Sequence, residues 1–259
     1  MGTVNLEDTK MMKNAKLNWV RLPINSLENC RELGGYSTEY GDQTKWHSFL
    51  RSSDMSKLSK EEIVFLREYG VKTVIDLRGE DEIETHKNPL AEEDFCEYYN
   101  IPFITEQVSD ITFSSNVNSI GDFYIDLLKQ NNDSVKRIFD VIDQAEEGCI
   151  IFHCAAGKDR TGILAMLLLG LAGVEKKDIV SNYEVTYTNL ESLQQIENPH
   201  GDIPKEFLYS NRDYIIRAYE YILHTYQSVE HYLLEKGVGK DMIDRVKGRL
   251  LGLGETVVS

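Results

Sequence analysis

The chain is short of cysteine, of proline and of long apolar runs, and each shortage excludes a class of protein. Four cysteines in 259 residues are too few for a disulfide-stapled scaffold, which leaves room for a free reactive thiol. The five prolines are dispersed, and no repeat or low-complexity linker divides the sequence. The longest apolar run, residues 162–174, is shorter than the ~20 residues that span a bilayer. We therefore expect a buried helix there and no stable insertion into a membrane.

Basic residues are also in deficit, because 28 Lys and Arg stand against 43 Asp and Glu and give a net charge of -15. Such an acidic surface repels DNA, RNA and anionic membranes, so no nucleic-acid partner is expected. An anionic substrate must then be drawn by a local basic site. Residues 1–22 mix charged and apolar residues and lack the apolar core of a secretory signal. We expect a cytoplasmic monomer, or a secreted one if a leader preceded Met1.

Strand and helix signals alternate along the chain. Ser59 and Glu62 form a capping-box pattern within an amphipathic stretch at 57–69, and Gly70 follows as a stop. Short apolar strands are predicted at 71–77 and 148–153. The sequence also predicts a helix near 135–145, a loop over 105–118, helices from 207 onward and a last helix at 240–253.

This alternation predicts one α/β domain over residues 20–259, with residues 1–19 as a mobile N-terminal extension. The central sheet should be mostly parallel and flanked by helices. In such folds the ligand site lies beyond the carboxyl ends of the strands. Polar clusters follow both predicted strands, so we expect the site there.

The segment at 153–162, HCAAGKDRTG, joins the second strand to the apolar helix. A short turn of this kind aims backbone N–H groups into one concavity, where the helix dipole adds about half a positive charge. Cys154 at the base of that cradle should be held as a nucleophilic thiolate. After five intervening residues, Arg160 can offer a planar fork to two phosphoryl oxygens, and Thr161 can hydrogen-bond the sulfur. The residues expected to bind phosphate are Ala155, Ala156, Gly157, Lys158, Arg160 and Thr161.

Phosphoryl transfer through cysteine also needs a group that protonates the leaving oxygen and later deprotonates water. Asp159 lies inside the loop, and Asp76 ends the predicted strand at 71–77 beside Arg78. Asp76 and Arg78 can equally be an ion pair that braces two loops. The residues alone do not separate the two carboxylates, so both are kept as catalytic candidates.

The loop HCAAGKDRTG resembles the signature of the atypical bacterial protein tyrosine phosphatases, which have Lys and Asp inside the phosphate loop. Three more segments are similar to family elements and occur in the family's order: NCRELGGY at 29–36, FLRS at 49–52 and VIDLR at 74–78. The stretch at 238–251 is similar to the family's C-terminal helix. So many matches in order are far more specific than one loop.

The resemblance implies a single-domain cysteine-phosphatase-like fold and a protein tyrosine phosphatase that needs no metal or cofactor. Phosphotyrosine proteins are the expected substrates, with phosphoserine, phosphothreonine and phosphoinositides as wider classes. By the same similarity Cys154 is the nucleophile, Arg160 the phosphate clamp, Asp159 the acid and base, and Lys158 a second cation. The residues expected to support the site are Asn29, Arg51, Arg78 and His153. Two positions depart from the family, since Cys30 replaces its usual Phe and Glu32 its usual Asp.

The same residues bear on other interpretations of the loop. A nucleotide P-loop is excluded, because Asp159 stands where Ser or Thr must follow the lysine. A metal cluster of Cys149, His153 and Cys154 is not expected, since adjacent strand residues point to opposite faces. The alternative function is a module that binds phosphoproteins or phosphoinositides without hydrolysing them. Sulfur or arsenate chemistry is a third possibility, and Cys30 or Cys149 could form a reversible disulfide with oxidised Cys154.

Overall fold

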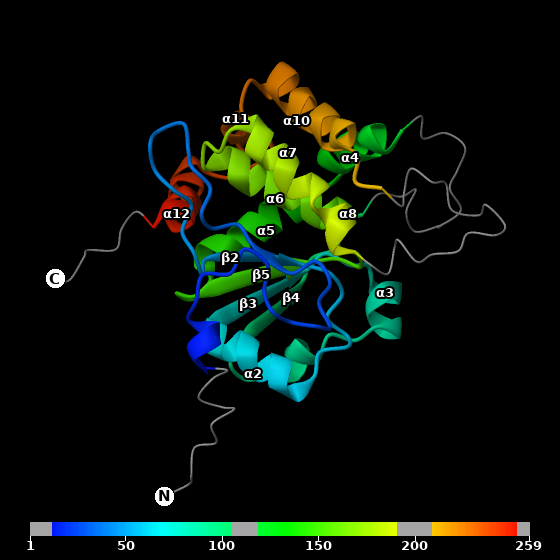
Figure 1. The fold of residues 1–259 in the computed structure, drawn as a ribbon. Helices are drawn as coiled ribbons and strands as arrows, with labels where there is room; N and C mark the ends of the chain where they lie inside the picture. The colour runs from blue at the N-terminus through cyan, green and yellow to red at the C-terminus, as the bar shows by residue number, and fades with distance from the viewer. Residues whose placement is uncertain (1–11, 105–118, 191–208, 253–259) are drawn as a thin grey trace, which may run out of the picture.

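A five-stranded sheet forms the centre of the protein (Figure 1). The structure is a computed structural model that describes residues 12–104, 119–190 and 209–252. The strands are β1 (Arg31–Glu32), β2 (Phe49–Ser52), β3 (Val71–Asp76), β4 (Glu97–Asn100) and β5 (Cys149–His153). They lie in the order β1-β2-β5-β3-β4, in which only the β1–β2 pairing is antiparallel. The predicted α/β fold with a mostly parallel sheet is confirmed.

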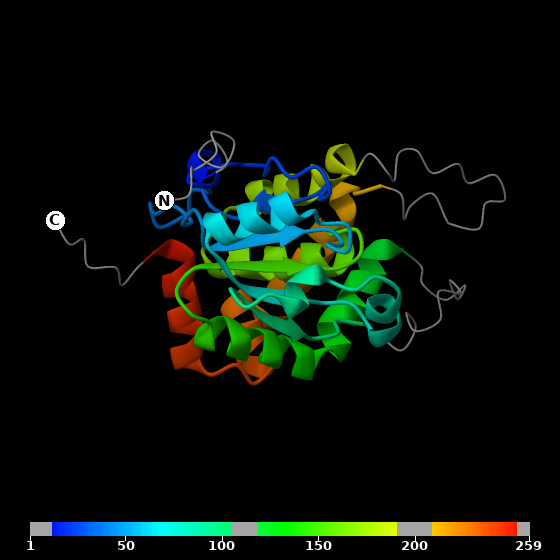
Figure 2. The same cartoon turned by 90° about the horizontal axis from the view of Figure 1, so that it is seen from below.

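Helices cover both faces of this sheet (Figures 1 and 2). Figure 1 shows α2 on one face, and α5, α6 and the remaining long helices on the other. The helices are α2 (Lys60–Tyr69), α3 (Glu80–Thr85), α4 (Ile120–Gln130), α5 (Asn132–Gln144), α6 (Asp159–Leu171), α7 (Lys176–Glu184), α8 (Thr186–Asn189), α10 (Arg212–Tyr226), α11 (Val229–Glu235), α12 (Lys240–Leu251) and the 3-10 helix η1 (Pro89–Glu92). The expected loop at 105–118 lies outside the described residues.

Side chains of the central strand β5 pack into two separate hydrophobic cores. Ile150 and Phe152 pack into the larger core with the helices of the α6 side, whereas Ile151 packs into the smaller core with α2. This alternation follows from the two-residue period of a strand. Cys154, just past the strand end, belongs to the larger core, and His153 therefore faces the other side. The prediction that these two neighbours point to opposite faces is confirmed.

The caps predicted for the first amphipathic helix define α2. The Ser59 hydroxyl accepts from the Glu62 backbone N–H, and the Glu62 carboxylate accepts from the Ser59 backbone N–H at 2.8 Å. Gly70 ends the helix with a φ of 99°, a left-handed conformation that glycine adopts without steric cost. The sequence thus placed both ends of this helix, with its N-cap at Ser59 and its stop at Gly70.

Part of the expected N-terminal extension packs on the domain. Ala15 is fully buried in the smaller core, and Trp19 lies against the same core and donates its indole N–H to the Asn14 carbonyl at 2.7 Å. The boundary at residue 20 stays a prediction. Across the three described ranges, no helix is both long and apolar enough to cross a bilayer.

A buried carboxylate, Glu32 of β1, lies at the end of the sheet away from the phosphate loop. It accepts hydrogen bonds from the Tyr69 hydroxyl at 2.5 Å, the His47 backbone N–H at 2.8 Å and the Gly34 backbone N–H at 3.2 Å. Burial raises its pKa to about 7, although these hydrogen bonds favour the ionised form. The folded protein therefore holds this proton more tightly than the unfolded chain does.

We expect Glu32 to make the protein less stable as the pH rises from about 4.5 to about 7. Within that window the unfolded chain has released the proton and the folded chain still binds it, so the free energy of unfolding falls with increasing pH. The loss is about 3 kcal/mol over the window. Urea titrations of wild type and Glu32→Gln should show a flatter pH dependence in the variant. The exposed control Glu97→Gln should keep the wild-type slope, and an unchanged slope in Glu32→Gln would contradict the expectation.

Candidate active site

The loop that follows β5 approaches the end of β2 so closely that only glycine fits at position 157. Gly157 has a φ of +66°, and a Cβ atom there would lie 2.4 Å from the Ser52 carbonyl oxygen. Both the left-handed backbone and the backbone contact exclude a side chain. The loop then enters α6 at Asp159, a helix that is buried along most of its length.

Three successive carbonyl groups of this loop accept hydrogen bonds from residues outside the loop. The Ala155 oxygen accepts from the Asp54 backbone N–H at 2.7 Å. The Asn29 side-chain amide donates to the oxygens of Ala156 at 3.2 Å and Gly157 at 3.0 Å. The Gly157 oxygen also accepts from Arg51 Nη2 at 2.7 Å. Asn29 and Arg51 thus lie beneath the loop and hold its carbonyl groups.

These outward carbonyls determine where the amide groups point. No cis peptide bond occurs in the described chain, so each C=O and the N–H of the next residue point in opposite directions. The N–H groups of residues 157 and 158 therefore face away from Asn29, and the N–H of residue 156 faces away from Asp54. Together with the N-terminus of α6 they form the concave, electropositive surface that a phosphate needs.

Arg160 projects from the first turn of α6 and is oriented by a carboxylate of α3. Its Nη1 and Nη2 donate to the two oxygens of Glu82 at 2.6 and 2.8 Å. Burial lowers the pKa of Arg160, but the Glu82 hydrogen bonds and the negative charge of Cys154 outweigh this and raise it. A guanidinium has five N–H donors, so three remain for the oxygens of a phosphate.

Asp159 opens α6 with its carboxylate partly exposed. Its Oδ1 accepts a 2.5 Å hydrogen bond from the hydroxyl of Tyr124 on α4 and lies 3.5 Å from Lys158 Nζ. Lys158 is buried and also donates to the Tyr209 carbonyl at 3.2 Å. The predicted acid and the second cation therefore lie side by side at the start of the helix.

Asp76 pairs with His153 in the sheet and lies on the face opposite to Cys154. Its carboxylate accepts from Arg78 Nη2 at 2.6 Å and from the Tyr98 hydroxyl at 2.8 Å, and lies 3.3 Å from His153 Nε2. Burial alone raises its pKa, but the hydrogen bonds and charges of His153 and Arg78 hold the pKa well below its usual range. This carboxylate is surrounded by donors and fully buried.

Arg78 connects that cluster to the loop. Besides Asp76 it binds the carboxylate of Asp54, whose backbone N–H holds the Ala155 carbonyl. It also donates to the His86 carbonyl at 2.8 Å. The Asp76–Arg78 pair thus braces the segment that supports the phosphate loop.

Another buried cation, Arg51, lies directly under the loop. Arg51 is fully buried, and the oxygens that it binds within the described chain, Asn182 Oδ1 at 2.6 Å and the Gly157 carbonyl, are neutral. Burial lowers its pKa to about 10, and the negative charge of Cys154 opposes this shift. A buried charge needs a counter-charge. A thiolate at Cys154 would supply it, as would a phosphate bound in the loop.

The other three thiols are held in their neutral form. Burial raises the pKa of Cys30 to about 12 and that of Cys96 to about 11, and it raises the pKa of Cys149 well above its usual value. All four cysteines are free in the structure. The Thr161 Oγ1 is buried and has no hydrogen-bond partner among the described residues. It is therefore available to a group that enters the loop.

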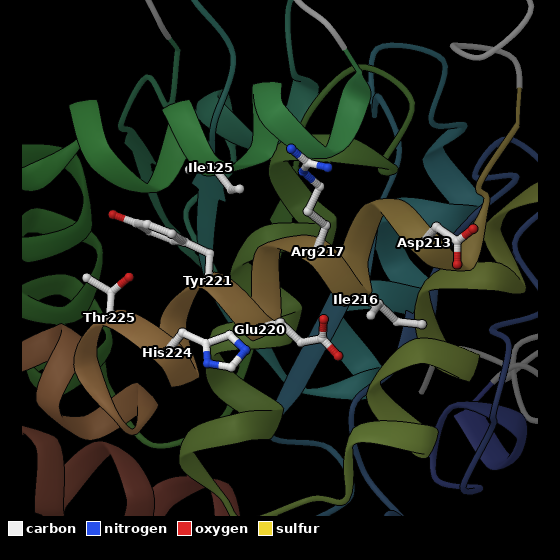
Figure 3. Close-up of a pocket in the computed structure, with 8 residues that line it drawn as sticks. All are labelled: Ile125, Asp213, Ile216, Arg217, Glu220, Tyr221, His224 and Thr225. Carbon is white, nitrogen blue, oxygen red and sulfur yellow. The ribbon is translucent and has the colours of Figure 1, made fainter.

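A shallow groove lies apart from this loop, between α10 and α4 (Figure 3). Two of its charged side chains form ion pairs, since Arg217 binds Asp122 at 2.5 Å and Glu220 binds Lys176 at 3.1 Å. Within the described ranges no three His, Cys, Asp or Glu side chains are grouped to hold a metal ion. The phosphate loop is therefore the site that the geometry supports.

Several residues of the site had not been singled out from the sequence. Glu82 and Tyr124 carry no local motif, and they meet Arg160 and Asp159 across 78 and 35 positions of the chain. Asp54 follows the recognised FLRS segment by two residues, which was the one signal available for it.

Comparisons of sequence place the chain in one family. Residues 22–252 match the family described as "Tyrosine phosphatase family". A "Tyrosine-protein phosphatase" of Nostoc commune is 32% identical over 221 residues, which cover 78% of this chain and 74% of that protein. The "Triple specificity protein phosphatase PtpB" of Mycobacterium tuberculosis is 24% identical over 250 residues, 78% of this chain and 90% of that protein. The crystal structure of P. aeruginosa TpbA shares 16% identity with a TM-score of 0.39 and covers 86% of this chain and 98% of that chain. The family expected from the sequence is confirmed, and the chain belongs to the tyrosine phosphatase family.

Proposed function

We propose that the chain hydrolyses phosphotyrosine in proteins through a phosphocysteine intermediate, without a metal ion. The observation that carries the proposal is the loop at 154–160, whose outward-bound carbonyls turn its N–H groups inward. Cys154 lies at the start of this loop, where the guanidinium groups of Arg160 and Arg51 would stabilise a thiolate. A nucleophile, an anion cradle and a guanidinium fork are the parts that phosphoryl transfer requires.

In the first step, the Cys154 thiolate attacks phosphorus while the bond from phosphorus to the tyrosine oxygen breaks. The leaving oxygen takes a proton from the carboxyl group of Asp159. Loop N–H groups and Arg160 hold the three equatorial oxygens as charge spreads over them. The products are free tyrosine side chain and phosphocysteine.

In the second step, water attacks the phosphocysteine and gives a proton to the Asp159 carboxylate. The bond between sulfur and phosphorus breaks, and inorganic phosphate and the Cys154 thiolate are released. Thr161 Oγ1, buried on the first turn of α6 without a partner among the described residues, would hydrogen-bond the departing sulfur. Arg51 beneath the loop favours the anionic sulfur in the same step.

Asp159 rather than Asp76 is proposed as the acid and base. Its side chain is 27% exposed beside the loop, whereas that of Asp76 is 0% exposed and surrounded by donors. Proton transfer requires reach to the substrate oxygen. Asp76, Arg78 and His153 are instead proposed to hold the loop's supporting segment in place.

Wider specificity is supported by one relative, because the mycobacterial protein is named for triple specificity. We propose phosphoserine, phosphothreonine and phosphoinositides as secondary substrate classes. Lys158, buried beside the acid, would meet an anionic leaving group or headgroup. A cytoplasmic monomer remains the proposed form of the protein.

The proposal is tested by assaying a phosphotyrosine peptide, its phosphoserine counterpart and a phosphoinositide in parallel, with EDTA present. We expect release of phosphate from the phosphotyrosine peptide at a rate that EDTA does not change. Saturable binding of the peptide without any phosphate release would instead support the binding module. Turnover that disappears with EDTA and returns with added metal would contradict the metal-free mechanism.

A further inference from the structure

Two buried tyrosines form a hydrogen-bonded chain that ends on Asp159. The Tyr124 hydroxyl lies 2.5 Å from Asp159 Oδ1 and 2.6 Å from the Tyr183 hydroxyl. Both tyrosines are buried, and their rings meet edge to face with centroids 6.0 Å apart. Tyr124 comes from α4 and Tyr183 from α7, so three helices fix this one carboxylate.

The direction of the hydrogen bonds follows from the chemistry of the last acceptor. A carboxylate only accepts, so Tyr124 donates its one proton to Asp159. Tyr124 must then accept from Tyr183, and the chain runs from Tyr183 through Tyr124 to Asp159. Burial, and next the charge of Asp159, raise the pKa of Tyr124 well above its usual value. Both hydroxyls therefore keep their protons at neutral pH and orient the carboxylate.

Tyr183, the first donor of this hydrogen-bonded series, lies beside the Arg51 guanidinium. A Cβ atom at Gly162 would contact the Tyr183 ring at 3.2 Å and Arg51 Nη2 at 3.6 Å, so ring and guanidinium are neighbours. A positive charge near the first donor and a carboxylate at the last acceptor both favour this one direction.

Within the described residues, the hydrogen bond and the ion pair of the Asp159 carboxylate both fall on one oxygen. Oδ1 receives the Tyr124 hydrogen bond and lies 3.5 Å from Lys158 Nζ. We propose that Tyr124, backed by Tyr183, is a positioning residue that occupies Oδ1 and thereby assigns the transferred proton to Oδ2. The inference rests on the proposed function, because it takes Asp159 as the acid.

The first test compares leaving groups. With Tyr124→Phe we expect kcat for a phosphotyrosine peptide to fall about tenfold at nearly constant KM, a part of the ~100-fold or more that general acid catalysis supplies. The loss of kcat should be smaller with dinitrophenyl phosphate, because its phenolate is a better leaving group and depends less on protonation. Tyr183→Phe should show the same trend with a smaller loss. Tyr232→Phe is the matched control, since its buried hydroxyl donates to the Leu128 carbonyl at 2.9 Å on the α11 side of the core.

The second test places Tyr124→Phe in an Asp159→Asn background. With the acid removed, the tyrosine change should lower kcat by less than about twofold, because both act through one step. An equal loss for all leaving groups, or a full further loss in the Asn background, would overturn the inference. If Tyr124→Phe does not fold by circular dichroism, Tyr183→Phe carries both tests. Turnover by the wild-type protein distinguishes the proposed phosphatase function from the positioning role of Tyr124. An inactive wild type would contradict the function, whereas an active wild type with unaffected tyrosine variants would contradict only the positioning role.

Discussion

Replacement of Cys154 by serine is expected to lower kcat for a phosphotyrosine peptide by at least about 10⁴-fold. A serine hydroxyl remains protonated at neutral pH and is a far weaker nucleophile than a thiolate, so no anion is present to attack phosphorus. The cradle itself is built from backbone groups and Arg160, which the substitution leaves in place. The variant should therefore still bind the peptide with a Kd close to the wild-type KM, measured by titration calorimetry.

Cys149→Ala is the matched control for this prediction. Cys149 starts the same strand, but it faces the smaller core, and burial holds its thiol in the neutral form. Its loss should affect stability and leave kcat close to wild type. Alkylation with iodoacetamide at pH 7 should modify Cys154 first, and inorganic phosphate should protect it. Turnover by Cys154→Ser near the wild-type rate would show that another group is the nucleophile.

The fold and the loop were predictable because their signals are local. Ser59, Glu62 and Gly70 are close in sequence, and together they specify both ends of α2. The phosphate loop is likewise one continuous segment between a strand and a helix. Strands β2 and β4 have only four residues each, too few for a pattern of alternation to identify them.

The partners of the loop were not predictable, since they depend on tertiary packing. Tyr124 resembles any buried helix residue until α4 is placed against α6. Asp76 shows the reverse problem. Its position at a strand end beside β5 suggested catalysis, but its alignment with His153 places it on the other face of the sheet from Cys154. A shift of one residue in the register would place the Asp76 side chain on the same face of the sheet as Cys154.

Replacement of Arg160 by lysine is expected to lower kcat/KM by about 10³-fold, although the charge is retained. Lysine carries a point charge and cannot bind two phosphoryl oxygens in a plane while also binding both oxygens of Glu82. Most of the loss should fall on kcat, because the fork meets its oxygens best as charge spreads over them in the transition state. Steady-state kinetics on the phosphotyrosine peptide measures both parameters.

Arg245→Lys provides the matched control, because Arg245 forms a similar two-pronged pair with Asp143 at 2.6 and 2.7 Å on the exposed side of α12. Exposed ion pairs contribute little, so this variant should keep wild-type kinetics. Glu82→Gln separates charge from orientation: Arg160 keeps its charge and loses one of its two fixed contacts, and the loss should lie between wild type and Arg160→Lys. If Arg160→Lys keeps more than about a tenth of the wild-type kcat/KM, a single charge suffices, and planar recognition by the fork is not what stabilises the transition state.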